Sequence, residues 1–415
     1  MKAAPLLVSC LENEGVRFAF GIPGEENLEL MNALRDSSVR FILTRHEGAA
    51  AFMADVCGRL TGHAGVCVAT LGPGATNLVT GVADAFLDRA PLVAITAQAN
   101  LSKIHRESHQ FIDILRLFGP ITKWSARVES PDTVPEIVRK AFKLAEAEKP
   151  GSTHIELPED AAEAETSTDL APLPRDVIRP PAPDRESLDK AAGLIQHAER
   201  PVILAGNGVI RGGASPELTK FAEDLQIPVA HTFMGKGTIP WTSPVSLLTI
   251  GVLPGDHELG GLDEADLVVC IGFDFVEYEP RSWNPRGDRR IVHIDSLPAE
   301  ISRHYVPAVE VVGEIRESLR GLRDRIRGPR DSGWARRKRE RAIRTLESEL
   351  GDVAERSLKP QRIVWDLRDI LEPDDLLLSD VGAHKLWLGR FFRSVKPNTV
   401  LVSNGLASMG IALPG

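Results

Sequence analysis

The chain has 415 residues, a formal net charge of −9 and a hydrophobic fraction of 43%. This length predicts two to three domains, and the composition excludes a disordered or fibrous chain. The acidic balance argues against a nucleic-acid-binding surface and against binding to an anionic membrane. No apolar run approaches the roughly 20 residues of a membrane span, and the N-terminus lacks the apolar stretch of a signal peptide.

The four cysteines predict a reducing compartment. Cys10, Cys57, Cys67 and Cys270 form no CxxC pair, and the last two lie within apolar, strand-like runs. Buried free thiols are typical of proteins that stay inside the cell. We therefore expect a cytoplasmic protein.

Residues 1–162 are predicted to form a first α/β domain. The expected helices span 3–14, 27–35, 48–55 and 131–147, and the expected strands span 17–20, 65–70, 91–96 and 151–157. An apolar run from Phe41 adds a strand before Arg45-His46-Glu47, and residues 100–122 are expected to be irregular. Residues 163–184 are rich in proline and lack apolar periodicity, which indicates a linker.

Residues 185–330 are predicted to form a second α/β domain, with helices at 187–197 and 215–225 and strands at 201–205, 228–232, 265–272 and 290–295. We interpret residues 331–358, which are strongly charged, as a linker or a solvated helix. A third domain is expected from residue 359 to 415, with helices at 360–371 and 383–392 and strands at 375–379 and 399–403. Two strands are too few for a stable sheet, so we expect this domain to be incomplete.

Two features of the first domain point to a ligand site. Glu47 and the loop Gly72-Pro73-Gly74-Ala75-Thr76-Asn77 each follow a predicted strand, so both are expected at the carboxyl edge of one parallel sheet. Ligands bind at that edge in such sheets. Taken alone, Glu47 also suits a surface acid at a helix start, and the glycine loop also suits a structural turn. The loop lacks the third glycine of a dinucleotide fingerprint.

Six segments follow one another in the order of a known family: Phe20-Gly21-Ile22-Pro23-Gly24, Arg45-His46-Glu47, the Gly72 loop, Pro120-Ile121-Thr122-Lys123, His293-Ile294-Asp295 and Ser403-Asn404-Gly405-Leu406-Ala407-Ser408-Met409-Gly410. With them the whole chain resembles the thiamine diphosphate-dependent enzymes, and within these the acetolactate synthases of the catabolic type that bind no FAD. The sequence departs from the family pattern at Gly48 and Phe111 and at residues 25–27.

The resemblance implies an α/β fold of three parallel-sheet domains of thiamine diphosphate-binding type, the third incomplete. These are a pyrimidine-binding domain (1–162), a central domain (185–330) and the start of a diphosphate-binding domain (359–415). The implied catalytic residues are Glu47, which would hydrogen-bond the cofactor's pyrimidine ring, and Gln110. The implied cofactor-binding residues are Pro23, Gly24, Glu47, Gly72, Gly74, Asn77, Gly382, His384, Ala407 and Met409. We assign no metal ligand, because the family's Mg²⁺ ligands are expected beyond residue 415 of a truncated chain.

The implied function is a carboligase that decarboxylates pyruvate and condenses it with a second 2-keto acid to give acetolactate, in branched-chain amino acid or acetoin metabolism. The alternatives are a decarboxylase or lyase of another 2-keto acid on the same fold, and an inactive, truncated nucleotide-binding module. The family shares its active sites between subunits, so we expect a homodimer or homotetramer. FAD is not expected, because residues 273–280 resemble the loop of the flavin-independent enzymes.

Overall fold

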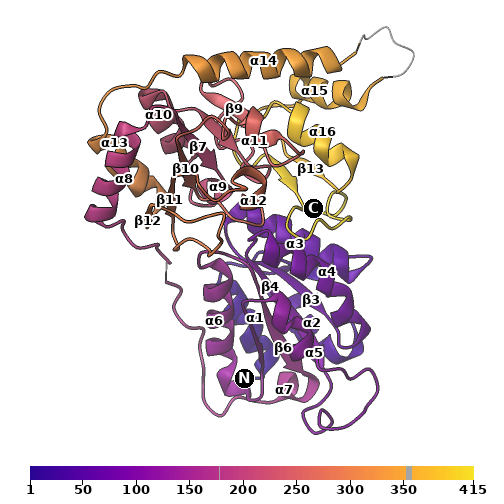
Figure 1. The fold of residues 1–415 in the computed structure, drawn as a ribbon. Coiled ribbons are helices and arrows are strands. Elements are labelled where there is room, and N and C mark those ends of the chain that lie inside the picture. The colour runs from indigo at the N-terminus through magenta and orange to yellow at the C-terminus, as the bar shows by residue number, and fades with distance from the viewer. Residues whose placement is uncertain (177, 352–357) are drawn as a thin grey trace. The chain divides into compact units, whose positions relative to one another are not determined.

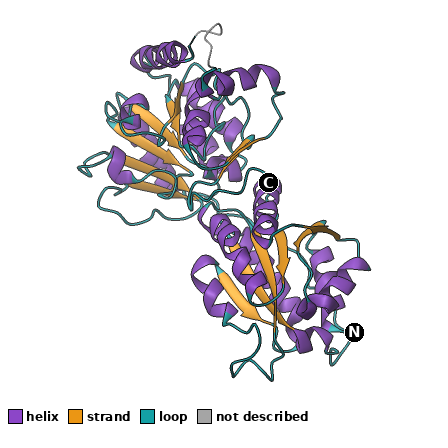
Figure 2. Cartoon of the chain, turned by 90° about the vertical axis from the view of Figure 1, so that its right-hand side faces the viewer, coloured by secondary structure: helices purple, strands orange, loops and turns teal. Residues whose placement is uncertain are grey.

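The computed structural model describes residues 1–176, 178–351 and 358–415 of the chain. The chain divides into two compact units (Figure 1). The first comprises Met1–Ile178 together with Ser403–Gly415, and the second comprises Arg179–Val402. Each unit has a central sheet between layers of helices, as the strands and helices of Figure 2 show.

The first unit is built on a six-stranded sheet in the order β2-β1-β3-β4-β6-β5, in which every neighbouring pair is parallel. The strands are β1 (Phe18–Gly21), β2 (Arg40–Leu43), β3 (Gly65–Ala69), β4 (Leu92–Gln98), β5 (Trp124–Arg127) and β6 (Ser152–Pro158). Gly21 pairs with both Leu43 and Val68, so the carboxyl ends of the first three strands meet at one edge.

Helices cover both faces of this sheet. They are α1 (Ala3–Asn13), α2 (Leu28–Arg35), α3 (Glu47–Thr61), α4 (Pro73–Leu87), α5 (Ile114–Phe118), α6 (Val134–Glu146) and α7 (Glu159–Glu163). One face packs Leu7 of α1 and Phe142 of α6 against Val66 and Val68 of β3. The other packs the small residues of α3 and α4 against Cys67 and Ala69 of the same strand. The side chains of β3 thus alternate between two cores, as buried parallel strands require.

The second unit repeats this plan with a parallel sheet in the order β12-β11-β10-β7-β8-β9. Its strands are β7 (Pro201–Ala205), β8 (Val229–His231), β9 (Ser246–Thr249), β10 (Leu267–Ile271), β11 (Ile291–Asp295) and β12 (Val309–Val312). Its helices up to residue 325 are α8 (Arg185–His197), α9 (Gly208–Arg211), α10 (Ser215–Leu225), α11 (Asp256–Leu259), α12 (Pro280–Trp283) and α13 (Ile315–Arg325).

A smaller layer within the second unit packs against its central part. It contains α14 (Gly333–Glu349), α15 (Pro360–Ile370), α16 (Ala383–Phe391) and a parallel pair of strands, β13 (Leu377–Ser379) and β14 (Val400–Val402). Phe392 and Val402 of this layer share a core cluster with Phe233 of the central part. The buried Lys236 adds a hydrogen bond from its Nζ to the Gly389 carbonyl at 3.0 Å. The layer is therefore held by apolar burial and by a buried polar contact.

The α/β fold with parallel sheets predicted from the sequence is confirmed. The sequence pattern did not predict β5, β9 and β12, which are four residues long and lie at sheet edges, where a short strand gives little apolar signal. Two helices were also not predicted: α13, and α5 inside the segment expected to be irregular. Asp113 caps α5 by accepting from the Arg116 N–H. The domain boundaries, including the start of a third domain at 359, stay predictions. Parts of the expected linkers, residues 177 and 352–357, lie outside the described residues.

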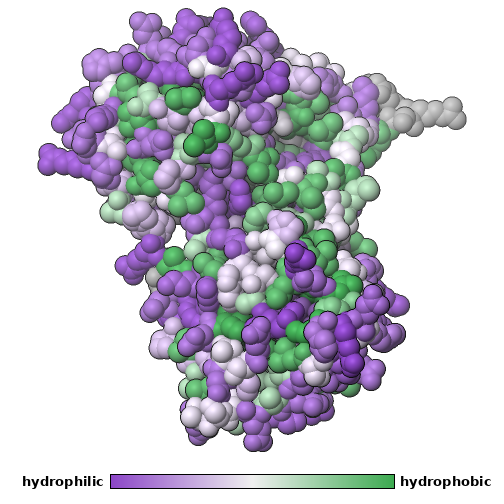
Figure 3. Space-filling model, turned by 60° about the horizontal axis from the view of Figure 1, so that its bottom comes forward, coloured by the Kyte–Doolittle hydropathy of each residue, from purple (hydrophilic) through white to green (hydrophobic). Residues whose placement is uncertain are grey.

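None of the helices in the described ranges is long and apolar enough to cross a membrane. The face of the molecule in Figure 3 intersperses hydrophilic and hydrophobic side chains. Scattered exposed apolar residues of this kind are normal on folded proteins and need no ligand to explain them.

Candidate active site

The strand order of the first unit changes direction between β1 and β3. The chain passes from β1 to β2 on one side and from β3 to β4 on the other, which opens the crevice where doubly wound sheets bind ligands. Gly24 follows β1 and packs so tightly that a Cβ built on it would lie 2.5 Å from the Thr70 Cβ. The Thr70 hydroxyl, after β3, donates to Glu26 Oε2 at 2.8 Å. Pro23 and Gly24 therefore lie at this crevice.

Glu47 is the first residue of α3 and is 9% exposed. The helix is capped by His46, whose Nδ1 accepts a hydrogen bond from the Gly48 N–H at 3.0 Å. Asn77 Nδ2 donates to Glu47 Oε2 at 3.0 Å. Oε1 accepts no hydrogen bond from the part of the chain that the structure describes. Two residues that the sequence analysis drew from separate motifs therefore meet, with one carboxylate oxygen left for a ligand.

Small residues allow α3 and α4 to approach closely enough for this contact. A Cβ built on Gly81 would lie 2.5 Å from the Ala51 Cβ, and one built on Gly48 would lie 3.3 Å from the Asn77 carbonyl oxygen. Ala50 is fully buried between the helices and the sheet. A larger side chain at these positions would separate the helices and move Asn77 away from Glu47.

Gln110 lies beside the Gly72 loop. A Cβ built on Gly72 would come within 2.7 Å of the Gln110 carbonyl oxygen, and both residues have positive φ, +50° and +57°. The buried amide of Gln98 ties the neighbouring loop to the sheet, because its Nε2 donates to the Ile112 carbonyl at 3.0 Å and to Glu156 Oε2 at 3.1 Å. The backbone of Gln110 is thus fixed while its side chain remains exposed.

Four ionisable residues at α3 and α4 form a buried group that we call the Arg59 cluster: Asp55, Arg59, Asp84 and Asp88. Arg59 lies 2.5 Å from Asp55, 2.8 Å from Asp88 and 3.6 Å from Asp84, and all three carboxyl side chains are at most 1% exposed. One guanidinium therefore serves three carboxyls. Burial, and then the charges of Asp88 and Asp55, raise the pKa of Asp84 to about 8. Asp84 is accordingly protonated at neutral pH.

The Arg59 cluster anchors the C-terminal segment of the first unit. Ser403 Oγ donates to Asp84 at 2.5 Å, and the backbone N–H groups of Asn404 and Gly405 donate to Asp88 at 2.9 and 2.5 Å. Further along, a Cβ built on Gly410 would lie 3.3 Å from the ring of Phe52 in α3. The segment therefore runs from the C-terminal end of α4 to Phe52 in the first half of α3, the helix that begins at Glu47.

Ala407 and Met409, predicted to contact the cofactor, belong to this anchored segment. Ala407 has a φ of +54°, and Met409 is 74% exposed. The segment packs on the first unit of its own chain, and the site shared between subunits that the resemblance implied stays a prediction. The Arg59 cluster was not predicted from the sequence. The signal that could have found it is the spacing of its charges, which stand four residues apart in otherwise small and apolar helices.

Gly382 and His384 belong to the second unit, after β13. Both are exposed, and a Cβ built on Gly382 would lie 2.8 Å from the His384 ring, so only glycine permits this ring position. Gly382 has a φ of +156°. Their predicted contact with a diphosphate stays a prediction.

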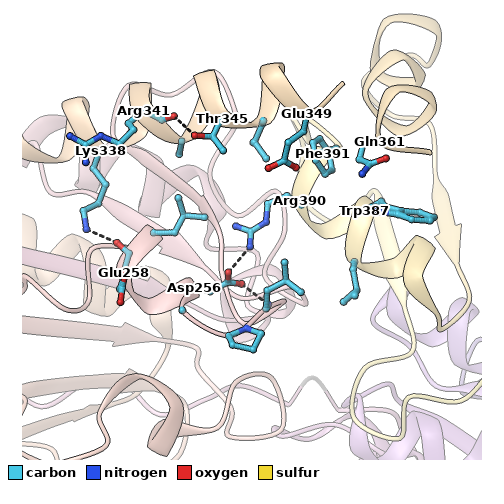
Figure 4. Close-up of a pocket in the computed structure, with 17 residues that line it drawn as sticks. Asp256, Glu258, Lys338, Arg341, Thr345, Glu349, Gln361, Trp387, Arg390 and Phe391 are labelled. Carbon is cyan, nitrogen blue, oxygen red and sulfur yellow. Dashed lines mark hydrogen bonds and ion pairs between the residues drawn. The ribbon is translucent and has the colours of Figure 1, made fainter. Parts of the chain in front are cut away.

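A cavity of about 720 Å³ lies elsewhere in the second unit, between α11, α14 and α16 (Figure 4). Two of its cations are already bound by the protein, since Arg390 contacts Asp256 at 2.5 Å and Lys338 donates to the Glu258 carbonyl at 2.5 Å. None of the residues predicted for the active site lines it. The cavity therefore gives no support to a second catalytic site.

The residues of the first unit fit the pyrimidine half of thiamine diphosphate. Glu47 offers a buried carboxylate oxygen, which is the acceptor that a protonated ring nitrogen needs. Within residues 1–176, 178–351 and 358–415 no three His, Cys, Asp or Glu side chains form a metal-binding group.

Comparison with known proteins places these features in a family. Residues 1–117 match the N-terminal TPP-binding domain of thiamine pyrophosphate enzymes, and residues 188–322 match their central domain. A "Probable acetolactate synthase large subunit" of Methanocaldococcus jannaschii is 39% identical over 100% of this chain and 72% of its own length. "Acetolactate synthase, catabolic" of Raoultella terrigena is 36% identical over 99% and 74%, and the acetolactate synthase of Bacillus subtilis is 34% identical over 100% and 73%. The chain therefore belongs to the thiamine pyrophosphate enzymes and, among them, to the acetolactate synthase family.

Proposed function

We propose that this chain acts as a thiamine diphosphate-dependent acetolactate synthase. Two pyruvates and one proton would give one acetolactate and one CO₂. The observation that carries the proposal is the half-satisfied carboxylate of Glu47, held by Asn77 at 3.0 Å in the crevice of the first sheet. The relatives named as acetolactate synthases, which align with this chain over nearly its full length, support the choice of reaction.

We assign to Glu47 the role of holding or sharing the proton of the cofactor's pyrimidine ring nitrogen. Glu47 Oε1 would accept a hydrogen bond from a ring nitrogen of the bound cofactor, while Asn77 holds Oε2 and so orients the carboxylate. A site with little water strengthens such a hydrogen bond. Thiamine diphosphate, when bound, supplies the electron sink that decarboxylation of a 2-keto acid needs.

The remaining residues have positioning or binding roles in this proposal. Gln110 presents an exposed amide to the substrate from a backbone fixed against Gly72. Met409, at 74% exposure, offers an apolar surface to the cofactor from the anchored segment. Magnesium, a homo-oligomeric assembly, a cytoplasmic location and independence from FAD are further parts of the proposal.

Replacing Glu47 with glutamine tests the assignment. Glu47→Gln keeps the side-chain volume and an acceptor oxygen but cannot take a proton, so acetolactate formation should fall by about 10²–10⁴-fold, the contribution of a positioned acid or base. The control is Glu136→Gln, a change at an exposed residue of α6 that should leave turnover unchanged. Acetolactate and CO₂ are measured on the full chain with added thiamine diphosphate and Mg²⁺. Unchanged turnover of a folded Glu47→Gln protein would remove Glu47 from the mechanism.

The products discriminate the carboligase from a simple decarboxylase on the same fold. With pyruvate as the only substrate, a carboligase yields acetolactate, whereas a decarboxylase yields acetaldehyde and the same CO₂. Acetaldehyde without acetolactate would replace the proposed reaction by the alternative.

A further inference from the structure

The second unit has its own crevice at a change of strand order. The chain runs from β7 to β8 and β9 on one side of the sheet, and from β10 to β11 and β12 on the other. The crevice therefore lies between the carboxyl ends of β7 and β10, where doubly wound domains bind the phosphates of nucleotides. Gly206-Asn207-Gly208 follows β7, and Gly272 follows β10, so glycine loops flank it on both sides.

A side chain of the protein fills this crevice. Both carboxylate oxygens of Glu277 accept from the Asn207 backbone N–H, at 3.1 and 3.0 Å. The Thr232 hydroxyl donates to Glu277 Oε2 at 2.5 Å and itself accepts from the Gly235 N–H at 2.9 Å. Glu277 thus receives a backbone N–H and a hydroxyl, which are the donors that a phosphate oxygen commonly uses.

The two glycine loops also contact each other directly. Gly208 N–H donates to the Gly272 carbonyl at 2.8 Å, and Gly206 N–H donates to the Ile271 carbonyl at 2.9 Å. A Cβ built on Gly206 would lie 2.4 Å from the Gly272 oxygen and 3.0 Å from Glu277 Oε2. The N–H groups of Gly206 and Gly208 thus donate within the protein. The lack of a Cβ at these glycines lets the two loops pack closely against each other, and it does not serve the approach of a ligand.

We propose that the Glu277 carboxylate occupies the phosphate position of the second unit from within and thereby excludes phosphate-bearing nucleotides, flavin dinucleotides included. A bound phosphate would have to displace Glu277 from the Asn207 N–H or share the crevice with its carboxyl group. Burial raises the pKa of Glu277 to about 7, so this carboxyl carries a full negative charge only above neutral pH. Asp274, 6% exposed and in the same loop, adds a second acid beside it. Arg211 is a cation whose charge acts on Glu277 and lowers its pKa in part. The exclusion of phosphate-bearing nucleotides thus depends on one side chain, that of Glu277.

Two variants, Glu277→Ala and Glu277→Ser, test the proposal by vacating the phosphate position. The serine variant keeps a hydroxyl that can accept from the Asn207 N–H. The matched control is Glu279→Ala, which removes the same charge from an exposed residue two positions on. The first readout is thermal unfolding of the full chain in phosphate or formate, compared with chloride at equal ionic strength. We expect either anion to stabilise the two Glu277 variants by an amount that grows with the logarithm of its concentration above the Kd, as mass action requires, and to leave the wild-type and control proteins unchanged.

The second readout is binding of ADP and of FAD by titration calorimetry and by flavin fluorescence. ADP should bind the Glu277 variants at least about tenfold more tightly than the wild type, the ratio that 1.4 kcal/mol of lost repulsion gives. Binding of ADP or FAD by the wild-type protein as tight as by the variants would overturn the proposal, and so would folded variants that gain no anion binding. Neither readout uses turnover, so its outcome is independent of the proposed acetolactate synthase reaction.

Discussion

The Arg59 cluster gives the sharpest test of how the first unit holds its C-terminal segment. Arg59→Met keeps the length of the side chain and a good helix former but leaves three buried carboxyls without their guanidinium. Removing one partner of a buried ion pair costs about 3–5 kcal/mol. For a unit of this size, that is a fall in the unfolding midpoint of roughly 6–20 °C, at about 2–4 °C per kcal/mol.

Asp84→Asn is the contrasting change within the same cluster. The pKa of Asp84 is raised to about 8, chiefly by burial, so the folded protein keeps a proton that the unfolded chain releases above about pH 4. Wild-type stability therefore falls as pH rises from about 4 toward 8, because the native state binds the extra proton over that interval. The amide needs no proton, so Asp84→Asn should be more stable than the wild type at pH 7, with an advantage that shrinks toward pH 5.

Thermal and urea unfolding of the two variants at pH 5, 7 and 8 provide the measurement. Hydrogen exchange of the Asn404 and Gly405 amides, which donate to Asp88, should speed up in Arg59→Met. The reasoning is refuted if Arg59→Met costs less than about 1 kcal/mol, the value of an exposed pair. It is equally refuted if Asp84→Asn destabilises the protein as strongly as Arg59→Met at pH 7.

Two further predictions follow from the backbone and the buried histidine of the first unit. Gly72→Ala places a Cβ at φ +50° and 2.7 Å from the Gln110 carbonyl, so it should cost more than Gly62→Ala, whose φ is +71° but whose Cβ would meet nothing within 4 Å. Strain of this kind is of order 1–3 kcal/mol, read from unfolding midpoints, and only Gly72→Ala should also weaken thiamine diphosphate binding. His154 is buried between Thr96 and Ser125, and burial lowers its pKa to about 3. It therefore contributes stability above pH 6.5 that is lost as pH falls toward 3, about 2 kcal/mol by pH 5, and His154→Gln should flatten the slope of urea-unfolding free energy against pH. An unchanged slope would show that the ring already carries a proton in the folded protein.

The sequence by itself determined the α/β plan and the central parallel strands of both large sheets. Strands such as 201–205 were predicted at their observed bounds, because a parallel strand buried on both faces reads as a continuous apolar run. The Gly72 loop follows such a strand, β3, whereas Glu47 follows the partly exposed edge strand β2. Both positions lie after the carboxyl ends of strands of the first sheet, as the sequence predicted. The edge strand β12 (Val309–Val312) was missed, because its partly exposed residues carry no such run.

Only the tertiary structure decided which groups meet. Glu47 and Asn77 are thirty residues apart, and their hydrogen bond depends on Gly81 and Ala51 letting two helices approach. Ser403 and Asp84 are 319 residues apart, and Glu277 and Asn207 are 70 apart, so no local pattern links them. Hydrophobic periodicity repeats over a few residues, so a short stretch of sequence is enough to predict which side of a helix or strand is buried. Hydrogen bonds and ion pairs between elements depend on the approach of whole helices and loops, and this approach is set by packing across the fold.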